Sequence, residues 1–201
     1  MKTKDITGTN QNTRNLIRTA LLGAIAFMLM FIDMPLSFIA PSFMKLDLSD
    51  VPALIGGFAM GPVYGAGIQL VKNLLNVTKT STMGVGELSN FIVGSTFVIT
   101  ASIIYKRRHN LKGAMIGLFF GVLAMSTLAC LSNYFVIFPL YGKIAIPMET
   151  IINMGRAINP QIDGLKAMIL FSVLPFNLIK GSVNAIATLL LYKKISPILK
   201  N

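Results

Sequence analysis

Long stretches of the chain carry no charged residue, and short charged segments separate them. The hydrocarbon core of a bilayer is about 30 Å thick, and roughly 20 helical residues cross it. Most of the uncharged stretches approach or exceed that length, so the pattern predicts an all-α integral membrane protein. The stretches are Thr19–Ile32, Val51–Val71, Leu88–Tyr105, Gly113–Gly142 and Ala167–Tyr192, of which the last is interrupted by Lys180.

The second stretch contains Gly61-Pro62 near its centre. Proline lacks a backbone N–H and disfavours the helical conformation in the residue before it. The stretch therefore forms either one kinked helix or two helices, Val51–Met60 and Val63–Asn76, joined by a turn. The first of these would be about 15 Å long, too short to cross a bilayer. We therefore expect the preceding loop, Phe38–Asp50, to dip into the protein and open an outward-facing pocket, because irregular backbone at that depth must be buried or line a cavity.

The distribution of Lys and Arg decides between these topologies, because cytoplasmic loops collect basic residues. Lys180 is left out of the 18 basic residues as intramembrane. Five spans then place nine of them on the N-terminal side and eight opposite, whereas six spans place eleven and six. With six spans, Asp5 is the one acid of seven on the basic side. The sequence predicts a six-helix bundle with both termini cytoplasmic, comprising a tail at 1–15, a membrane domain at 16–192 and a tail at 193–201.

Composition agrees with a membrane location. Of the 201 residues, 54% are hydrophobic and 12% are charged, and the mean hydropathy is +0.70, whereas about a quarter of the residues of a soluble domain are charged. The net charge of +11 is explained as a topological signal that meets anionic lipid headgroups of the bilayer, so nucleic acid is not expected as a partner.

Several residue types needed for common chemistries are scarce. Cys130 is the single cysteine and His109 the single histidine, which excludes an intrachain disulfide, a cysteine-based metal site and an HExxH zinc site. No G-x-x-x-x-G-K-[ST] loop for ATP is present. We therefore expect no metal site and no catalytic residue.

Polar side chains fall inside the predicted spans, where lipid cannot satisfy them. A lysine near the bilayer centre costs on the order of 2.5–3.5 kcal/mol, so it normally faces a partner or a wet cavity. Either these groups line a site for a polar solute, or Lys180 snorkels outward or pairs with Glu87 or Asp47 for structural reasons. The set is Asn90, Asn133, Asn177 and Lys180, with Glu87 at the outer start of the fourth span.

Five blocks of sequence carry a family resemblance: Phe43–Phe58 (FMKLDLSDVPALIGGF), Gly61–Gly65 (GPVYG), Val71–Leu75 (VKNLL), Val85–Phe91 (VGELSNF) and Pro175–Gly181 (PFNLIKG). Together they resemble the substrate-capturing S components of energy-coupling factor (ECF) vitamin transporters of prokaryotic cell membranes, and most closely the riboflavin-specific members. The resemblance covers about Leu16–Tyr192 and is most specific from the first loop into the third helix.

The resemblance implies a six-helix S component that is not an enzyme and needs no cofactor. Riboflavin would be the transported ligand, bound from the outside. Asn and Lys side chains can donate hydrogen bonds to flavin carbonyl oxygens, and Asp and Glu can accept from ribityl hydroxyls. Phe38, Phe43, Phe91 and Leu46 are candidates for apolar walls. The substrate-binding residues implied are Lys45, Leu46 and Asp47, which would close over the solute, with Glu87, Asn90, Asn133, Asn177 and Lys180.

The resemblance also gives a meaning to Ala20 and Ala24 on the first span. Taken from the residues, this pair is a small-residue face of the kind that lets helices pack closely. In S components such a face docks on the transmembrane T subunit, which two ABC-type ATPases drive.

Two other functions are compatible with parts of the pattern. An S component for another vitamin, such as thiamin, folate or biotin, would keep the fold and change the pocket. An integral-membrane enzyme could use Glu87, Lys180 or Asp47, but no nucleophile and base stand at a motif spacing. A structural scaffold would bind nothing and would leave Lys180 unexplained.

Overall fold

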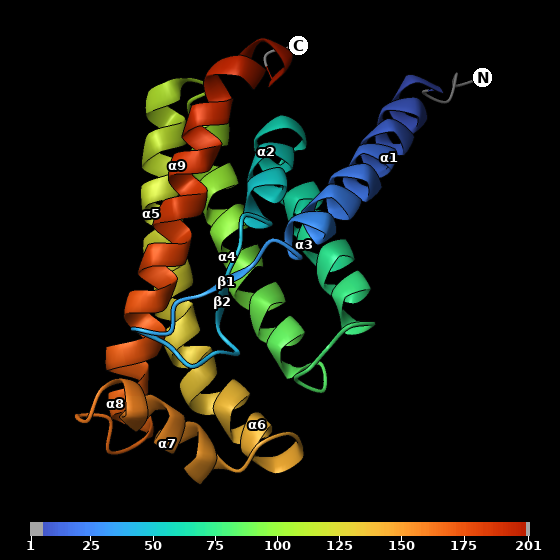
Figure 1. Cartoon of the computed structure of the whole chain (residues 1–201). Coiled ribbons are helices and arrows are strands. Elements are labelled where there is room, and N and C mark those ends of the chain that lie inside the picture. Colours follow the sequence, from blue (N-terminus) through green and yellow to red (C-terminus); the bar gives the residue numbers. More distant parts are fainter. Residues whose placement is uncertain (1–5, 200–201) are drawn as a thin grey trace.

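Helices make up most of the chain in the computed structural model, which describes residues 6–199. The long helices pack together, and the first of them lies oblique to the last (Figure 1). The elements are α1 (Ile6–Leu29), β1 (Met34–Pro35), β2 (Lys45–Leu46), α2 (Asp50–Met60), α3 (Pro62–Val77), α4 (Val85–Arg107), α5 (Leu111–Ser132), the π-helical turn η1 (Asn133–Ile137), α6 (Phe138–Ile144), α7 (Met148–Ile158), α8 (Leu165–Met168), the π-helical turn η2 (Ile169–Val173) and α9 (Leu174–Leu199).

The turn predicted at Gly61-Pro62 is confirmed. Gly61 has φ 103° and ψ 167°, a conformation essentially restricted to glycine, and its N–H donates to the carbonyl of Gly57. Pro62 opens α3 at the first helical position, where its missing N–H removes no helical hydrogen bond. The second uncharged stretch therefore forms two antiparallel helices, α2 and α3, which lie against α4 (Figure 1).

Glycine residues allow α2 and α3 to lie close together and against α4. A Cβ atom added to Gly65 would meet Val98 of α4 at 2.4 Å and the Cα atom of Gly57 at 3.0 Å. On the other side of α4, a Cβ on Gly117 of α5 would meet the carbonyl oxygen of Ala101 at 2.6 Å. Gly57, Gly65 and Gly117 thus let these helices approach one another closely.

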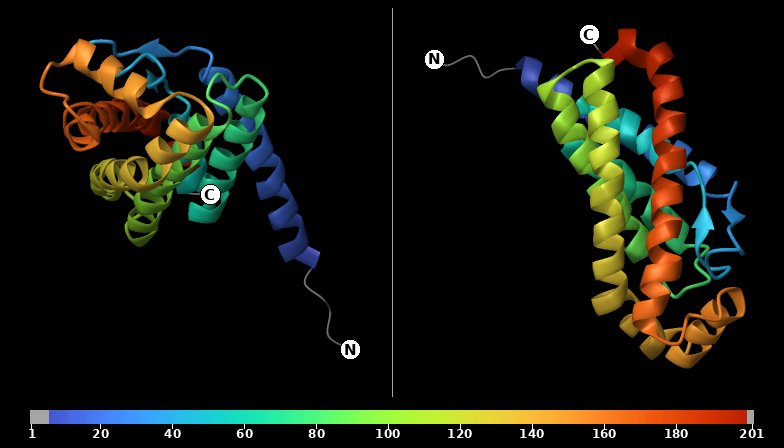
Figure 2. Two further views of the ribbon diagram at one scale, coloured as in Figure 1. Left: turned by 90° about the horizontal axis from the view of Figure 1, so that it is seen from below. Right: turned by 90° about the vertical axis from the view of Figure 1, so that its left-hand side faces the viewer.

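The prediction of six helices is incomplete. Three described segments are long and apolar enough to cross a membrane, namely Val85–Arg107, Leu111–Ile144 and Leu165–Tyr192. The stretch Gly113–Gly142 lies within one uninterrupted helical segment, Leu111–Ile144, in which the π-helical turn η1 joins α5 to α6. The segment expected as an outer loop forms α7 and α8, and these short helices cover one end of the bundle (Figures 1 and 2).

The first helix begins earlier than its apolar pattern indicates, at Ile6 rather than Thr19. The N-terminal end of α1 and the C-terminal end of α9 lie at the same end of the molecule, opposite α6 and α7 (Figure 2). Such an arrangement requires an even number of passes between the two ends of the chain.

A long loop connects α1 to α2 and contains the β1–β2 hairpin, in which Met34 pairs with Leu46 and Pro35 with Lys45. The loop is attached to the start of α9 by a small apolar cluster of Leu36, Ala40 and Phe176. Its last residues enter the protein, as expected: Asp47 is 5% exposed and Asp50 1%.

Substituting Gly61 by alanine tests the turn. We expect Gly61→Ala to lower the free energy of unfolding by about 1–3 kcal/mol, because alanine is strained at this φ and ψ. Gly164→Ala is the matched control: Gly164 has extended backbone (φ −168°), and a Cβ there meets nothing within 4 Å. Thermal unfolding of the two variants in detergent measures the difference, and equal stability would contradict the strain argument.

Candidate functional site

A cavity of about 620 Å³ lies between the α1–α2 loop, the α3–α4 connection, α4, α5, η1, α6 and α9. Its volume falls in the range of small-molecule sites, roughly 300–1,000 Å³. Seven of the eight residues predicted to bind substrate line it: Lys45, Asp47, Glu87, Asn90, Asn133, Asn177 and Lys180. The eighth, Leu46, is not among the lining residues and instead packs against the apolar cluster that attaches the loop to α9.

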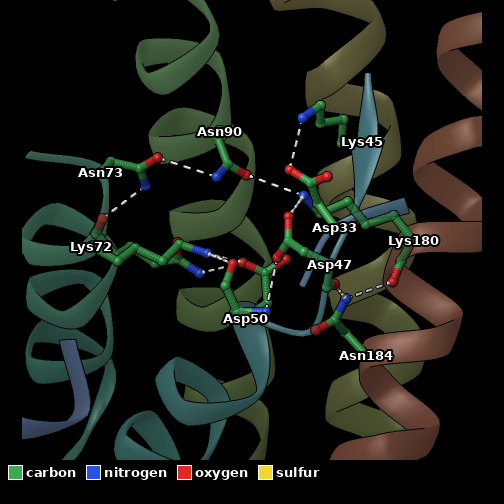
Figure 3. A network of polar contacts seen from close by, with 11 residues as sticks. Asp33, Lys45, Asp47, Asp50, Lys72, Asn73, Asn90, Lys180 and Asn184 are labelled. Atoms are coloured by element: carbon green, nitrogen blue, oxygen red, sulfur yellow. Dashed lines mark hydrogen bonds and ion pairs between the residues drawn. The ribbon is translucent and has the colours of Figure 1, made fainter. Parts of the chain in front are cut away.

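Lys180 links the wall of the cavity to the α1–α2 loop. Its Nζ lies 3.0 Å from Oδ2 of Asp47 and 3.4 Å from Oδ1 of Asn90, and the residue is 7% exposed (Figure 3). The ammonium group has three N–H donors, so one remains for a molecule in the cavity. Lys180 pairs with Asp47 and not with Glu87, and it also lines the cavity.

Asp47 is held from several sides. Ser49 donates its backbone N–H to Oδ1 at 2.8 Å, and Nδ2 of Asn184 donates to the Asp47 carbonyl at 2.9 Å. Burial by itself would raise the pKa of the Asp47 carboxyl, but the nearby ammonium groups of Lys180 and Lys72 and the hydrogen bonds from Ser49 outweigh burial and lower that pKa to about 2. Asp47 is therefore ionised at neutral pH.

Asn133 and Asn177 lie next to the two π-helical turns. Each donates its Nδ2 hydrogen to the carbonyl four residues earlier, Ala129 for Asn133 and Val173 for Asn177, so the amide oxygen stays free for a partner in the cavity. Pro139 and Pro175 follow the turns by two residues. Because proline cannot donate to the carbonyl four residues back and clashes with it, widening the helix just before it removes the conflict. Such π-turns are frequent at functional sites.

The carboxylate of Glu87 already accepts hydrogen bonds from the end of α3 and from the α3–α4 connection. Asn76 donates to Oε1 at 2.9 Å, and the hydroxyls of Thr80 and Thr82 donate to Oε2 at 2.9 and 3.0 Å. A carboxylate has about four acceptor positions, so one is left for a molecule in the cavity. Glu87 thus fixes the edge of the cavity as well as lining it.

Sequence reasoning missed a second buried ion pair. Nζ of Lys72 in α3 lies 2.6 Å from Oδ1 of Asp50, and the two side chains are 0% and 1% exposed. Gln69 also donates to the same oxygen, at 2.9 Å. Lys72 was counted with the outer loops because an uncharged run ends at Val71. Its place inside the predicted helix Val63–Asn76 was the signal that should have marked it as intramembrane.

The remaining predicted residues are placed as follows. Lys45 forms an ion pair with Asp33 at 2.9 Å near the surface. Of the candidate apolar walls, Phe43 lines the cavity and stacks at 5.5 Å on Tyr141, whereas Phe38 is 72% exposed and Phe91 is not among the lining residues. Within residues 6–199, no three His, Cys, Asp or Glu residues gather as a metal site would require.

Ala20 and Ala24 are exposed on α1. Gly23, between them in sequence, is buried against α3, where a Cβ atom would meet Val71 at 2.5 Å. Leu16, Ile17 and Leu21 of the same helix are also more than half exposed. One side of α1 therefore packs on α3, and the other presents small and apolar residues outward.

Comparison with known proteins agrees with this geometry. The family model "ECF transporter, substrate-specific component" matches residues 14–192. The chain is 40% identical over 190 residues to the riboflavin transporter RibU of Staphylococcus aureus (strain TCH60), covering 94% of each protein. It is 32% identical over 187 residues to the riboflavin transporter FmnP of Bacillus subtilis (strain 168), covering 92% of this chain and 93% of the relative.

A solved structure described as the S component of a bacterial ECF transporter superimposes with a TM-score of 0.75 at 37% sequence identity. The match covers 94% of this chain and 99% of the other.

The Lys72–Asp50 pair predicts a specific pattern of stabilities. We expect Lys72→Met or Asp50→Asn alone to lower the free energy of unfolding by about 3–5 kcal/mol, because each leaves one buried charge unpaired. The double variant removes both charges and should recover most of the loss. Thermal unfolding in detergent measures the three variants, and a double variant no more stable than the single variants would contradict the pairing.

Proposed function

The chain belongs to the family of substrate-specific (S) components of ECF transporters, and we propose on this premise that it captures riboflavin outside the cell for import. It is a transport subunit of the prokaryotic cell membrane, with several passes, and not an enzyme. The observation that carries the proposal is the cavity lined by Lys180 and four asparagines, Asn76, Asn90, Asn133 and Asn177, in a chain whose relatives are riboflavin transporters.

The chemistry of the lining suits a flavin. The free N–H of Lys180 and the amide groups of Asn90, Asn133 and Asn177 offer donors and acceptors for the carbonyl and ring N–H groups of the isoalloxazine. Phe43, Ile137 and Phe138 supply apolar area for its ring faces. Asp47 and Glu87 can accept from ribityl hydroxyls, and Lys45 with Leu46 belongs to the loop that covers the site.

We place six helices, α1 to α5 and α9, in the membrane with both termini in the cytoplasm; α2 is too short to cross by itself, and the buried end of the α1–α2 loop completes its pass. Two features support this topology. The ends of α1 and α9 lie together, opposite α6 and α7 (Figure 2). The excess of basic residues on the cytoplasmic side becomes larger once Lys72 is recognised as buried. Of the 18 Lys and Arg residues, this topology places eleven on the cytoplasmic side and five outside, and Lys72 and Lys180 are within the protein. The cavity then opens outward.

Energy for import must come from partners. As an S component, the chain would associate with a transmembrane T subunit and two ABC-type ATPases, and the outward face of α1 at Ala20 and Ala24 is the surface we assign to the T subunit. Small residues there let a partner helix approach closely.

Riboflavin binding can be measured directly on the purified chain in detergent. We expect a stoichiometric flavin absorption band after purification, or nanomolar quenching of riboflavin fluorescence on titration. Lys180→Ala and Asn177→Ala should each weaken binding roughly tenfold or more, because each removes a hydrogen bond in a desolvated site.

The matched control for these two variants is Tyr105→Phe, which removes the buried hydrogen bond between Tyr105 and Tyr192 outside the cavity. It should bind riboflavin like the unmodified chain. Tight binding of a different vitamin and none of riboflavin would overturn the substrate assignment, and unchanged affinity in both Lys180→Ala and Asn177→Ala would overturn the site.

The contact proposed between the T subunit and the outward face of α1 can be tested separately. Ala20→Trp should leave riboflavin affinity unchanged, because Ala20 is exposed and outside the cavity, and should abolish riboflavin uptake by cells that contain the complete transporter. Leu190→Trp, at an outward position on α9 that is 69% exposed, is the control and should leave uptake intact. Normal uptake by the Ala20→Trp variant would exclude this face as the T-subunit contact.

A further inference from the structure

Lys72 and Asp50 are the most completely buried pair of opposite charges among the described ion pairs. Lys72 does not line the cavity, so it makes no contact in the binding site proposed above. Burying two charges is costly even when they are paired, and an apolar pair of the same size is often at least as stable. The pair therefore calls for an explanation other than stability.

The hydrogen bonds around Lys72 lead to the cavity wall. Its ammonium donates to Oγ of Ser49 at 2.7 Å as well as to Asp50. Ser49 in turn donates its backbone N–H to Oδ1 of Asp47 at 2.8 Å, which leaves Oδ2 of Asp47 for Lys180 at 3.0 Å. One chain of contacts thus runs from α3 through the end of the loop to α9 (Figure 3).

The two ion pairs are joined through Ser49, and each acts electrostatically on the other. Asp50 acts electrostatically on Lys180 as well as on Lys72, and Lys72 acts on Asp47 as well as on Asp50. If Lys72 were missing, the spare carboxylate of Asp50 would compete for Lys180. If Asp50 were missing, the spare ammonium of Lys72 would compete for Asp47. Either change would break up the pairing between Asp47 and Lys180.

We propose that Lys72 and Asp50 are positioning residues: by neutralising each other they reserve Asp47 for Lys180 and so hold the Lys180 ammonium at the wall of the cavity. This inference rests on the proposed function, because it assumes that Lys180 contacts the bound riboflavin. Lys72 does not line the cavity, so it acts on affinity only through its neighbours, whereas Asp50 also lines the cavity itself. The variants of Lys72 are therefore the ones that separate positioning from direct contact.

The test is the riboflavin affinity of the folded fraction of each full-length variant, measured by fluorescence quenching after the unfolded fraction is removed by gel filtration. Lys72→Met and Asp50→Asn should each weaken binding roughly tenfold, the size expected when a charged hydrogen bond is displaced. The double variant Lys72→Met/Asp50→Asn contains neither competing charge and should bind within about threefold of the unmodified chain.

A double-mutant cycle between Lys72 and Lys180 distinguishes a positioning role of Lys72 from a general structural role. In a Lys180→Ala background, Lys72→Met should cause no further loss of affinity, because the group through which it acts is gone. In an Asn177→Ala background the tenfold loss should persist. Additive losses in both backgrounds would overturn the inference, as would folded single variants that bind like the unmodified chain.

The single charge variants could fail to fold because each leaves one buried charge unpaired. Ser49→Ala leaves no buried charge unpaired, so it tests the inference in that case. This substitution removes the side-chain hydroxyl oxygen of Ser49, which accepts a hydrogen bond from the Lys72 ammonium. The inference predicts about a threefold loss of affinity that disappears in the Lys180→Ala background, and unchanged affinity would contradict it.

If the unmodified chain does not bind riboflavin, the proposed function fails first. If it binds and only the Lys72 and Asp50 effects are missing, the proposed function stands and the positioning role falls.

Discussion

The pairing of buried charges is the constraint on which this molecule depends. Asp47, Asp50, Lys72 and Lys180 are each less than a tenth exposed, and together they carry no net charge. In a nonpolar interior an unpaired charge costs several kcal/mol, and a partner of opposite charge offsets much of that cost. The end of the α1–α2 loop must therefore lie between α3 and α9, where the two lysines are. This requirement fixes one wall of the cavity.

The opposite wall depends on two departures from regular helix. At η1 and η2 the helical hydrogen bonds run to the carbonyl five residues back, from Phe138 to Asn133 and from Leu174 to Ile169. Proline just beyond each turn makes the regular pattern unfavourable there. The wider turns leave Asn133 and Asn177 at the cavity with their amide oxygens free. The same prolines that interrupt the helices therefore help to shape the site.

Helix α3 lies between the loop that lines the cavity and helix α1, whose outward face we assign to the T subunit. Lys72 on α3 binds the end of the loop at Ser49 and Asp50, and Val71 beside it packs against Gly23 of α1, leaving no room there for a side chain. The exposed alanines of α1 lie on the other side of the same helix. Helix α3 thus contacts both the loop that lines the cavity and the helix that carries the surface assigned to the T subunit.

Charge and hydrophobicity along the chain were sufficient to indicate the membrane location, the break at Gly61-Pro62 and five of the polar residues that line the cavity, namely Glu87, Asn90, Asn133, Asn177 and Lys180. These properties are local: a glycine–proline pair breaks a helix wherever it stands, and Asn177 and Lys180 share a face because of helical spacing. The tertiary structure decided the pairing of Lys72 with Asp50, the choice of Asp47 over Glu87 as partner of Lys180, and the packing of Leu46 against the apolar cluster instead of the cavity. Each depends on segments more than 20 residues apart meeting in space, and no local pattern encodes which buried charge will find which partner.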